Sequence, residues 1–155
     1  MKGNDQLIDS LNRMLADELT AINQYIVHSE MCKNWGYDRL HDAIEKRAID
    51  EMKHAEKLIA RILFLEGLPV VSALNPLHIG ANVVDQLEND AQAEYGAVKG
   101  YNETIRLAVE VSDNTTRVML DGILHDEEDH IDWLEAQSDQ IKQMGLANYL
   151  TQQVG

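Results

Sequence analysis

Four long segments of this chain carry apolar residues at steps of three and four, which is the period of an α-helix and not of a β-strand. They run from about Asp5 to Lys33, Arg39 to Glu66, Ala81 to Val111 and Thr115 to Met144. A short apolar tail, Leu146 to Leu150, follows the fourth segment and is long enough for one or two helical turns. We therefore predict an all-α protein whose four long helices bury their apolar stripes against one another.

Short polar breaks separate the first helix from the second and the third from the fourth. Gly36 is expected to end the first helix and Asp38 to cap the second, while Ser112 to Asn114 supplies capping residues for the fourth. Gly67 and Gly145 are expected to end the second and fourth helices. These breaks predict two pairs of antiparallel helices.

The connection between the second and third helices is different. Gly67 to Gly80 has no helical period and contains both prolines of the chain. An extended linker of this length reaches roughly 46–50 Å, whereas the second helix is only about 42 Å long. We therefore predict a crossover that returns along the bundle, so that the third helix runs parallel to the second.

Composition narrows the class of protein. The chain has 155 residues, which predicts one domain, and we detect no sequence repeat. Its net charge of −14 argues against binding to a nucleic-acid backbone or an anionic membrane. No apolar run approaches the length of a membrane span, and the first residues lack a secretion signal. With Cys32 as its single cysteine, the chain is expected to be cytoplasmic.

Four glutamates occupy positions that the apolar stripes assign to the core, one near the middle of each helix. They are Glu18, Glu51, Glu94 and Glu127. Burying four uncompensated carboxylates is strongly unfavourable. Protonation is one way to relieve the charge. Cation binding is the other, because two divalent ions balance four negative charges.

His54 and His130 each lie one turn beyond one of these glutamates, so that Glu-x-x-His occurs twice. Carboxylate and imidazole ligands without thiolate suit iron or manganese, and zinc less specifically. One Glu from each of two helices plus Glu-x-x-His from each of the other two is the pattern of ferritin-like di-iron and di-manganese bundles. The alternative is a hydrogen-bonded polar cluster without metal.

Several longer stretches resemble one known family from end to end. They are Met1 to Gly3, Ala21 to Tyr25, Lys33 to Gly36, Ile49 to Ala55, Arg61 to Pro69, Asp126 to Glu135 and Asn148 to Leu150. These stretches resemble the bacterioferritins. The resemblance implies a single ferritin-like domain over residues 1–155, a four-helix bundle with one long crossover and a short C-terminal helix. It also implies a hollow shell of twenty-four identical subunits built from two-fold dimers, with ferric mineral stored inside.

The resemblance also implies a role for each candidate ligand of a di-iron centre. Glu18 and Glu94 match terminal carboxylates, Glu51 and Glu127 match bridging carboxylates, and His54 and His130 match imidazole ligands paired with Glu18 and Glu94 respectively. The implied activity is that of a ferroxidase, which oxidises Fe(II) with O₂ or H₂O₂. Tyr25 matches a tyrosine near that centre and could supply a further electron, or could simply be a buried tyrosine.

Met52 matches the axial ligand of haem b shared between two subunits. It follows Glu51 directly, so its side chain points about 100° away from the bundle interior, onto the outer surface. An extra apolar row on the first helix, Leu19, Ile22 and Ile26, could line the haem pocket, and Leu15 widens that row. Packing of Met52 in a dry dimer interface is the alternative.

Some positions depart from the family pattern or have two interpretations. Lys46 replaces an iron-binding histidine of the inner wall of the shell, and we expect it to form a salt bridge with Asp50. Four polar residues match a family pore but could also be ordinary solvated residues: Asn34, Glu66, Asp132 and Asp139. The remaining histidines lie off the metal stripe and are predicted to be on the surface: His28, His41, His78 and His125.

Three other protein classes remain as rivals or are excluded. A haem-free bacterial ferritin would share the oxidation chemistry, and a cage with a purely structural role would leave the cluster empty or filled by zinc. A peroxide reductase of the rubrerythrin kind needs a further cysteine-ligated iron domain, which one cysteine cannot build. The bacterioferritin resemblance implies a small iron–sulfur ferredoxin as the reductant for iron release.

Overall fold

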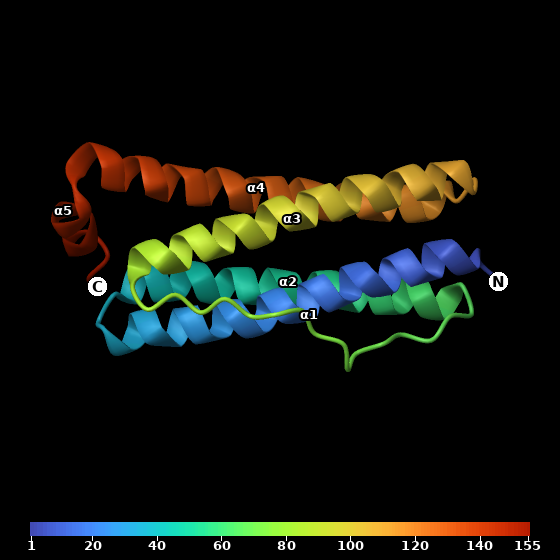
Figure 1. Ribbon diagram of the computed structural model, residues 1–155, viewed down its shortest axis with the longest axis horizontal. Helices are drawn as coiled ribbons and strands as arrows, with labels where there is room; N and C mark the ends of the chain where they lie inside the picture. The colour runs from blue at the N-terminus through green and yellow to red at the C-terminus, as the bar shows by residue number, and fades with distance from the viewer.

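The computed structural model describes residues 1–155 and contains five α-helices and no strand. The helices are α1 (Asp5–Asn34), α2 (Asp38–Phe64), α3 (Val83–Glu110), α4 (Asn114–Met144) and α5 (Leu146–Thr151). Figure 1 shows the four long helices side by side, with α5 across one end of the bundle. The structure therefore confirms the predicted four-helix bundle and its short C-terminal helix. None of the five helices combines the length and apolar character that a membrane crossing requires.

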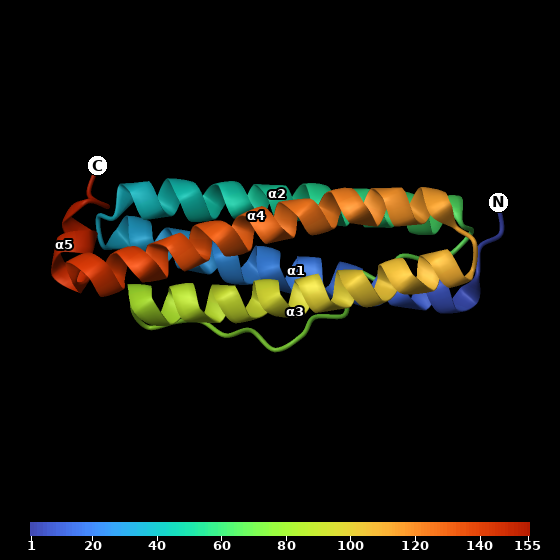
Figure 2. The ribbon, with the colours of Figure 1, turned by 90° about the horizontal axis from the view of Figure 1, so that it is seen from above.

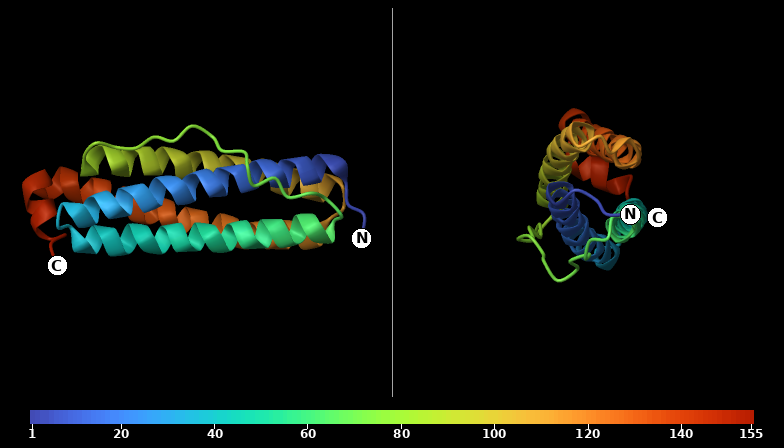
Figure 3. Two further views of the ribbon diagram at one scale, coloured as in Figure 1. Left: turned by 90° about the horizontal axis from the view of Figure 1, so that it is seen from below. Right: turned by 90° about the vertical axis from the view of Figure 1, so that its right-hand side faces the viewer.

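The helices form two antiparallel pairs, α1 with α2 and α3 with α4, and α1 also packs against α3 (Figures 1 and 2). Residues 65–82 join the end of α2 to the start of α3 at the opposite end of the bundle. As Figure 3 shows, this connection runs along the outside of the bundle, so that α3 runs parallel to α2. The predicted crossover is confirmed.

The crossover is tied to α1 by side chains that recur every two helical turns. Its backbone N–H groups donate to three of them: Val70 to Oδ1 of Asn12 (2.8 Å), Asn75 to Oγ1 of Thr20 (2.9 Å) and Gly80 to Nε2 of His28 (3.0 Å). At 3.6 residues per turn, each step of eight residues moves about 80° around the helix axis, so the crossover follows α1 obliquely. These positions of α1 are polar because they satisfy the backbone of an irregular segment.

The prediction that His28 and His41 lie on the surface was wrong. His28 is fully buried, with Nδ1 2.9 Å from Oδ1 of Asp90, and His41 is buried with Nδ1 2.9 Å from the carbonyl oxygen of Ser29. The prediction assumed that each helix buries only one face. It therefore overlooked the face of α1 that the crossover covers and the contact between α1 and α2. His78 and His125 are exposed, as predicted.

Two apolar clusters hold the bundle together on either side of its middle. One contains Leu11, Leu58 and Leu120, and the other contains Ile44, Leu87 and Leu134. Leu15 belongs to the first cluster and is fully buried, so it forms no outer contact surface. The four core glutamates lie between the two clusters along the helices, and apolar packing therefore shields them from water at both ends.

The helix ends differ from prediction in two details. Asp38 is the first residue of α2 and makes no side-chain cap, because Tyr37 occupies the cap position. The α2 helix ends at Phe64, and Glu66, with φ of 62°, makes the left-handed turn expected of Gly67. The predicted cap in the second short turn is confirmed, since the Asp113 carboxylate accepts the N–H of Thr116.

Candidate metal centre

The structure brings the six predicted ligands together in the middle of the bundle. All six are buried, and they come from all four long helices: Glu18, Glu51, His54, Glu94, Glu127 and His130. We call them the six-residue cluster. Their ligand atoms form two sets of four, each set lying within 4.8 Å. Glu18 and His54 occur in one set, Glu94 and His130 in the other, and Glu51 and Glu127 belong to both.

Both imidazole rings turn Nδ1 towards the carboxylates. Nδ1 of His54 lies 2.8 Å from Oε1 of Glu127 and 3.7 Å from Oε2 of Glu18. Nδ1 of His130 lies 3.1 Å from Oε1 of Glu51 and 3.4 Å from Oε1 of Glu94. The sets are therefore mixed oxygen and nitrogen cages.

Most polar atoms of the cluster have no hydrogen-bond partner. Buried atoms without one include Oε2 of Glu18, Oε2 of Glu94, both carboxylate oxygens of Glu127 and Nδ1 of each histidine. The short contact between His54 and Glu127 is not aligned as a hydrogen bond. Buried polar groups are normally satisfied. Converging, unsatisfied oxygen and nitrogen atoms fit bound cations better than they fit the metal-free hydrogen-bonded alternative.

A second layer of carboxylates fixes the orientation of the imidazoles. Nε2 of His54 lies 2.8 Å from Oδ2 of Asp126, and Nε2 of His130 lies 3.2 Å from Oδ2 of Asp50. A carboxylate at Nε2 accepts an N–H and leaves the lone pair of Nδ1 free for a cation. The predicted salt bridge between Lys46 and Asp50 is absent, because Asp50 faces His130 and the Lys46 side chain is exposed.

Bound protons balance the negative charge of the cluster when no metal is present. Burial, reinforced by the negative charge of Glu51, raises the pKa of Glu18 well above its usual value, and burial raises that of Glu127 likewise. Burial alone would lower the pKa of the two histidines, but their contacts with Glu18, Glu51 and Glu94 outweigh it. The pKa of His54 rises to about 11 and that of His130 to about 9. Protons therefore take the place of divalent cations, and cation binding must release them.

Two tyrosines contact the carboxylates of Glu18 and Glu94. Tyr25 donates its hydroxyl hydrogen to Oε1 of Glu94, which confirms its predicted place beside the cluster. Tyr101, which the helix pattern assigned to the apolar stripe, donates to Oε1 of Glu18. The sequence contained a signal for Tyr101, since Glu18 and Tyr25 have the same spacing as Glu94 and Tyr101.

This spacing is part of an internal repeat that the sequence analysis missed. One constant interval separates five pairs of residues: Glu18 from Glu94, Tyr25 from Tyr101, Asp50 from Asp126, Glu51 from Glu127 and His54 from His130. Each member of a pair makes the same contact with the opposite pair of helices. The repeat is hard to see in the sequence because only isolated functional residues are repeated, and the residues around them are not.

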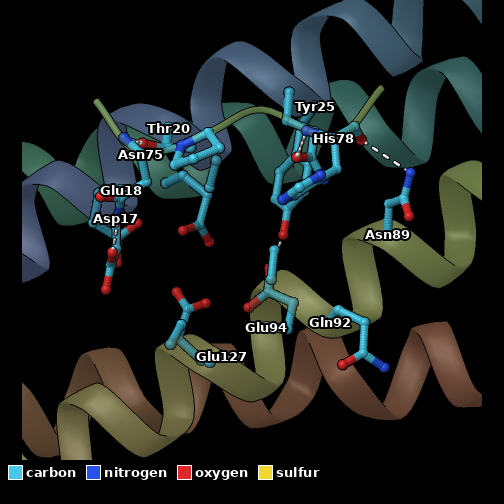
Figure 4. A pocket seen from close by; sticks show the side chains of 17 residues that line it. Asp17, Glu18, Thr20, Tyr25, Asn75, His78, Asn89, Gln92, Glu94 and Glu127 are labelled. Carbon is cyan, nitrogen blue, oxygen red and sulfur yellow. Dashed lines mark hydrogen bonds between the residues drawn. The ribbon is translucent and has the colours of Figure 1, made fainter. Parts of the chain in front are cut away.

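A cavity of about 600 Å³ connects the cluster with the surface between α1, α3 and the crossover. Figure 4 shows Glu18, Glu94 and Glu127 at its inner end and Asp17, Asn75 and Gln92 along its walls. Few of its lining residues are hydrophobic. The cavity is therefore suited to the passage of hydrated cations and small polar oxidants.

Met52 lies on the outer surface of α2, as predicted, with 46% of its area exposed. Ile49, one turn earlier on the same face, and Ile26 of neighbouring α1 are also exposed, at 43% and 46%. Leu19 and Ile22, which were predicted to share this surface, are half-buried and pack against the apolar cluster that contains Leu11. Large exposed apolar residues such as Met52, Ile49 and Ile26 are typical of a surface that contacts a partner.

Comparison with known proteins identifies the family to which this fold belongs. Residues 8–144 match the ferritin family, described as a ferritin-like domain, and this defines the class of protein. The chain is 42% identical to a bacterioferritin of Brucella melitensis over 96% of its own length and 92% of that protein. It is 40% identical to a bacterioferritin of Mycolicibacterium paratuberculosis over 98% and 96%, and 41% identical to one of Rhodobacter capsulatus over 94% and 90%. The chain belongs to the bacterioferritin family, and this membership supports iron storage as its function.

Proposed function

We propose that this protein is a ferroxidase that oxidises Fe(II) to Fe(III) with O₂ or H₂O₂ before the iron is stored. The observation that carries the proposal is the pair of overlapping ligand sets with Glu51 and Glu127 in common. Shared carboxylates hold two substrate ions close together, so that two electrons can pass to one oxidant molecule. Pairing the electrons avoids release of a one-electron oxygen radical.

The residues of the chain divide the work of substrate binding. Glu18 and Glu94 each face one ion, Glu51 and Glu127 face both, and the histidines complete the two sets. Four carboxylates neutralise two Fe(II) ions, and the protons held by the metal-free cluster leave as the ions enter. The polar cavity of Figure 4 is the route we propose for entry.

The test is a stopped-flow measurement on iron-free protein. About two Fe(II) ions per subunit are added in air, and ferric absorbance is followed for the natural protein and for Glu127→Ala. Glu128→Ala is the matched control, because Glu128 is the exposed neighbour on the same helix. We expect a fast phase that saturates near this ratio, is lost in Glu127→Ala and is kept in Glu128→Ala. Absence of a fast phase in the natural protein would leave the cluster with a structural role or with zinc.

The exposed apolar face around Met52 supports a second part of the proposal. Met52 of two subunits related by a two-fold axis would hold haem b between them, with Ile26 and Ile49 against the ring. When bound, haem supplies a one-electron relay for the reduction and release of stored iron. The protein contributes the thioether ligands and a dry pocket.

The remaining proposals concern assembly and cellular setting. We propose that residues 1–155 act as one ferritin-like unit in a shell of twenty-four subunits in the cytoplasm, with an iron–sulfur ferredoxin as reductant. Family membership supports a homo-oligomer. Asn34, Glu66, Asp132 and Asp139 are all exposed, as a pore between subunits requires. Size-exclusion chromatography with light scattering tests the number of subunits.

A further inference from the structure

We propose that Tyr101 is a positioning residue for Glu18, and that it leaves only one oxygen of this carboxylate free to bind a cation. The inference rests on the proposed metal site and goes beyond it, because it assigns a task to a residue outside the six-residue cluster. It also predicts how Glu18 binds, and not merely that it binds.

Tyr101 contacts Glu18 directly. Tyr101 is a fully buried residue of α3, and its hydroxyl donates to Oε1 of Glu18 on α1. The other oxygen of this carboxylate, Oε2, is buried without a hydrogen-bond partner and lies 3.7 Å from Nδ1 of His54. The two oxygens of Glu18 therefore have different roles: one is held by a phenol and the other is bare.

The Tyr101 hydroxyl makes no other hydrogen bond. Tyr101 packs within an apolar cluster that includes Met14, Leu58 and Leu120. A buried hydroxyl that loses its acceptor carries the full cost of desolvation. Since Glu18 is the single acceptor in contact, the phenol and the carboxylate hold each other in place.

The other half of the site shows the same arrangement. Tyr25 of α1 donates to Oε1 of Glu94 on α3, and Oε2 of Glu94 is buried without a partner. Each terminal carboxylate is thus oriented by a tyrosine from the opposite helix. Recurrence in both halves of the site argues that the bare oxygen belongs to the architecture of the site and is not an accident of packing.

This arrangement has a chemical consequence. A carboxylate that binds through both oxygens fills two positions around an ion, whereas one held by a phenol fills a single position. Reactive metal sites keep a position open for the reacting molecule. Tyr101 and Tyr25 would therefore preserve space for an oxidant beside each ion.

Crystal structures of the full-length protein loaded with Zn²⁺ provide the test. In the natural protein we expect one Glu18 oxygen on the ion and the other on Tyr101. In Tyr101→Phe we expect Glu18 to bring both oxygens to the ion or to rotate, with Glu94 unchanged. Tyr25→Phe should give the reciprocal result. The control is Tyr149→Phe, which removes a buried tyrosine whose hydroxyl donates to Gln137 (2.8 Å) away from the cluster.

Zn²⁺ titration calorimetry on the same proteins gives a second reading in solution. Loss of a partner behind a metal ligand typically weakens metal binding about tenfold or more. We expect Tyr101→Phe to weaken one of two Zn²⁺ binding steps by about that factor and Tyr149→Phe to weaken neither. A Tyr101→Phe protein with unaltered Glu18 geometry and affinity would overturn the inference, as would natural protein with both Glu18 oxygens on the ion.

These failures differ from failure of the proposed function. If the natural protein binds no Zn²⁺ in the cluster and shows no fast iron oxidation, the metal site itself is wrong. If it binds two ions and oxidises iron rapidly while Tyr101→Phe has the geometry and affinity of the natural protein, only the role of Tyr101 is wrong.

Discussion

Nε2 of His54 lies 2.8 Å from Oδ2 of Asp126, the residue directly before Glu127 on the opposite helix pair. Asp126 thereby fixes the ring of a residue in one candidate ligand set, while its neighbour Glu127 belongs to both sets. His130 and Asp50 repeat the relationship at 3.2 Å. Every imidazole of the cluster is thus oriented by the helix that carries the other imidazole.

Replacing Asp126 should weaken metal binding without removing a ligand. In Asp126→Ala the His54 ring loses the acceptor that keeps Nδ1 aimed at the carboxylates, and metal affinity should fall about 10–100-fold. Zn²⁺ titration calorimetry measures the change. Asp129→Ala is the control, because Asp129 is exposed and directly precedes His130 on the same helix. Equal affinities in the two variants would contradict the orienting role of Asp126.

The metal-free protein should lose stability as the pH rises. The folded state raises the pKa of His130 from 6.5 to about 9 and that of His54 to about 11, so it binds protons more tightly than the unfolded chain. This stabilisation is complete below pH 6.5 and disappears as the pH rises through 9 towards 11. Each unit of pKa shift corresponds to about 1.4 kcal/mol. The unfolding temperature of the chelator-treated protein should therefore fall from pH 6.5 to pH 9.

Two histidine variants and added metal test whether proton loss from the cluster causes the decline in stability. His130→Gln should show a shallower decline with pH than the natural protein, whereas His125→Gln, at an exposed position, should follow the natural protein. Saturating Zn²⁺ should reverse the trend, because cations compete with protons for the cluster. A pH-independent unfolding temperature in the metal-free protein would rule out proton-balanced carboxylates.

Gly80 should not tolerate a side chain. A Cβ atom there would lie 2.3 Å from the backbone nitrogen of Gln86, so the start of α3 would have to move. Gly80→Ala should destabilise the protein by about 1–3 kcal/mol. Gly122→Ala, inside α4 with open space around it, should instead stabilise by up to about 1 kcal/mol through helix propensity. Thermal unfolding compares the two, and equal effects would show that the close approach at Gly80 carries no cost.

Met52→Leu should remove the proposed axial ligand of haem while preserving the apolar face. Added haem should bind the natural protein at one per two subunits, with the absorption spectrum of thioether-ligated iron. In Met52→Leu that spectrum should be lost, and iron oxidation at the cluster should continue at the natural rate. An unchanged haem spectrum in the variant would show that another residue holds the iron.

The sequence allowed the helices, the crossover and the residues of the six-residue cluster to be predicted because each follows from spacing along one chain. Glu18 and Glu94 were recognised because a carboxylate stands out on an apolar stripe. Tyr101 was not, because tyrosine is an ordinary core residue until its acceptor is known. His28 and Asp50 were misjudged for a related reason, since their partners Asp90 and His130 are distant in sequence and are brought near only by packing.

The internal repeat has a consequence for how such a site could arise. One hairpin, α1 with α2, contributes Glu18, Tyr25, Asp50, Glu51 and His54, and the other contributes the five equivalent residues. Each hairpin therefore carries half of a complete set, and two copies of a single hairpin would supply every functional group in the right number. The crossover then serves as a covalent tether between the two hairpins. The chemistry of the site does not itself require this tether, because two separate, identical chains would supply the same groups.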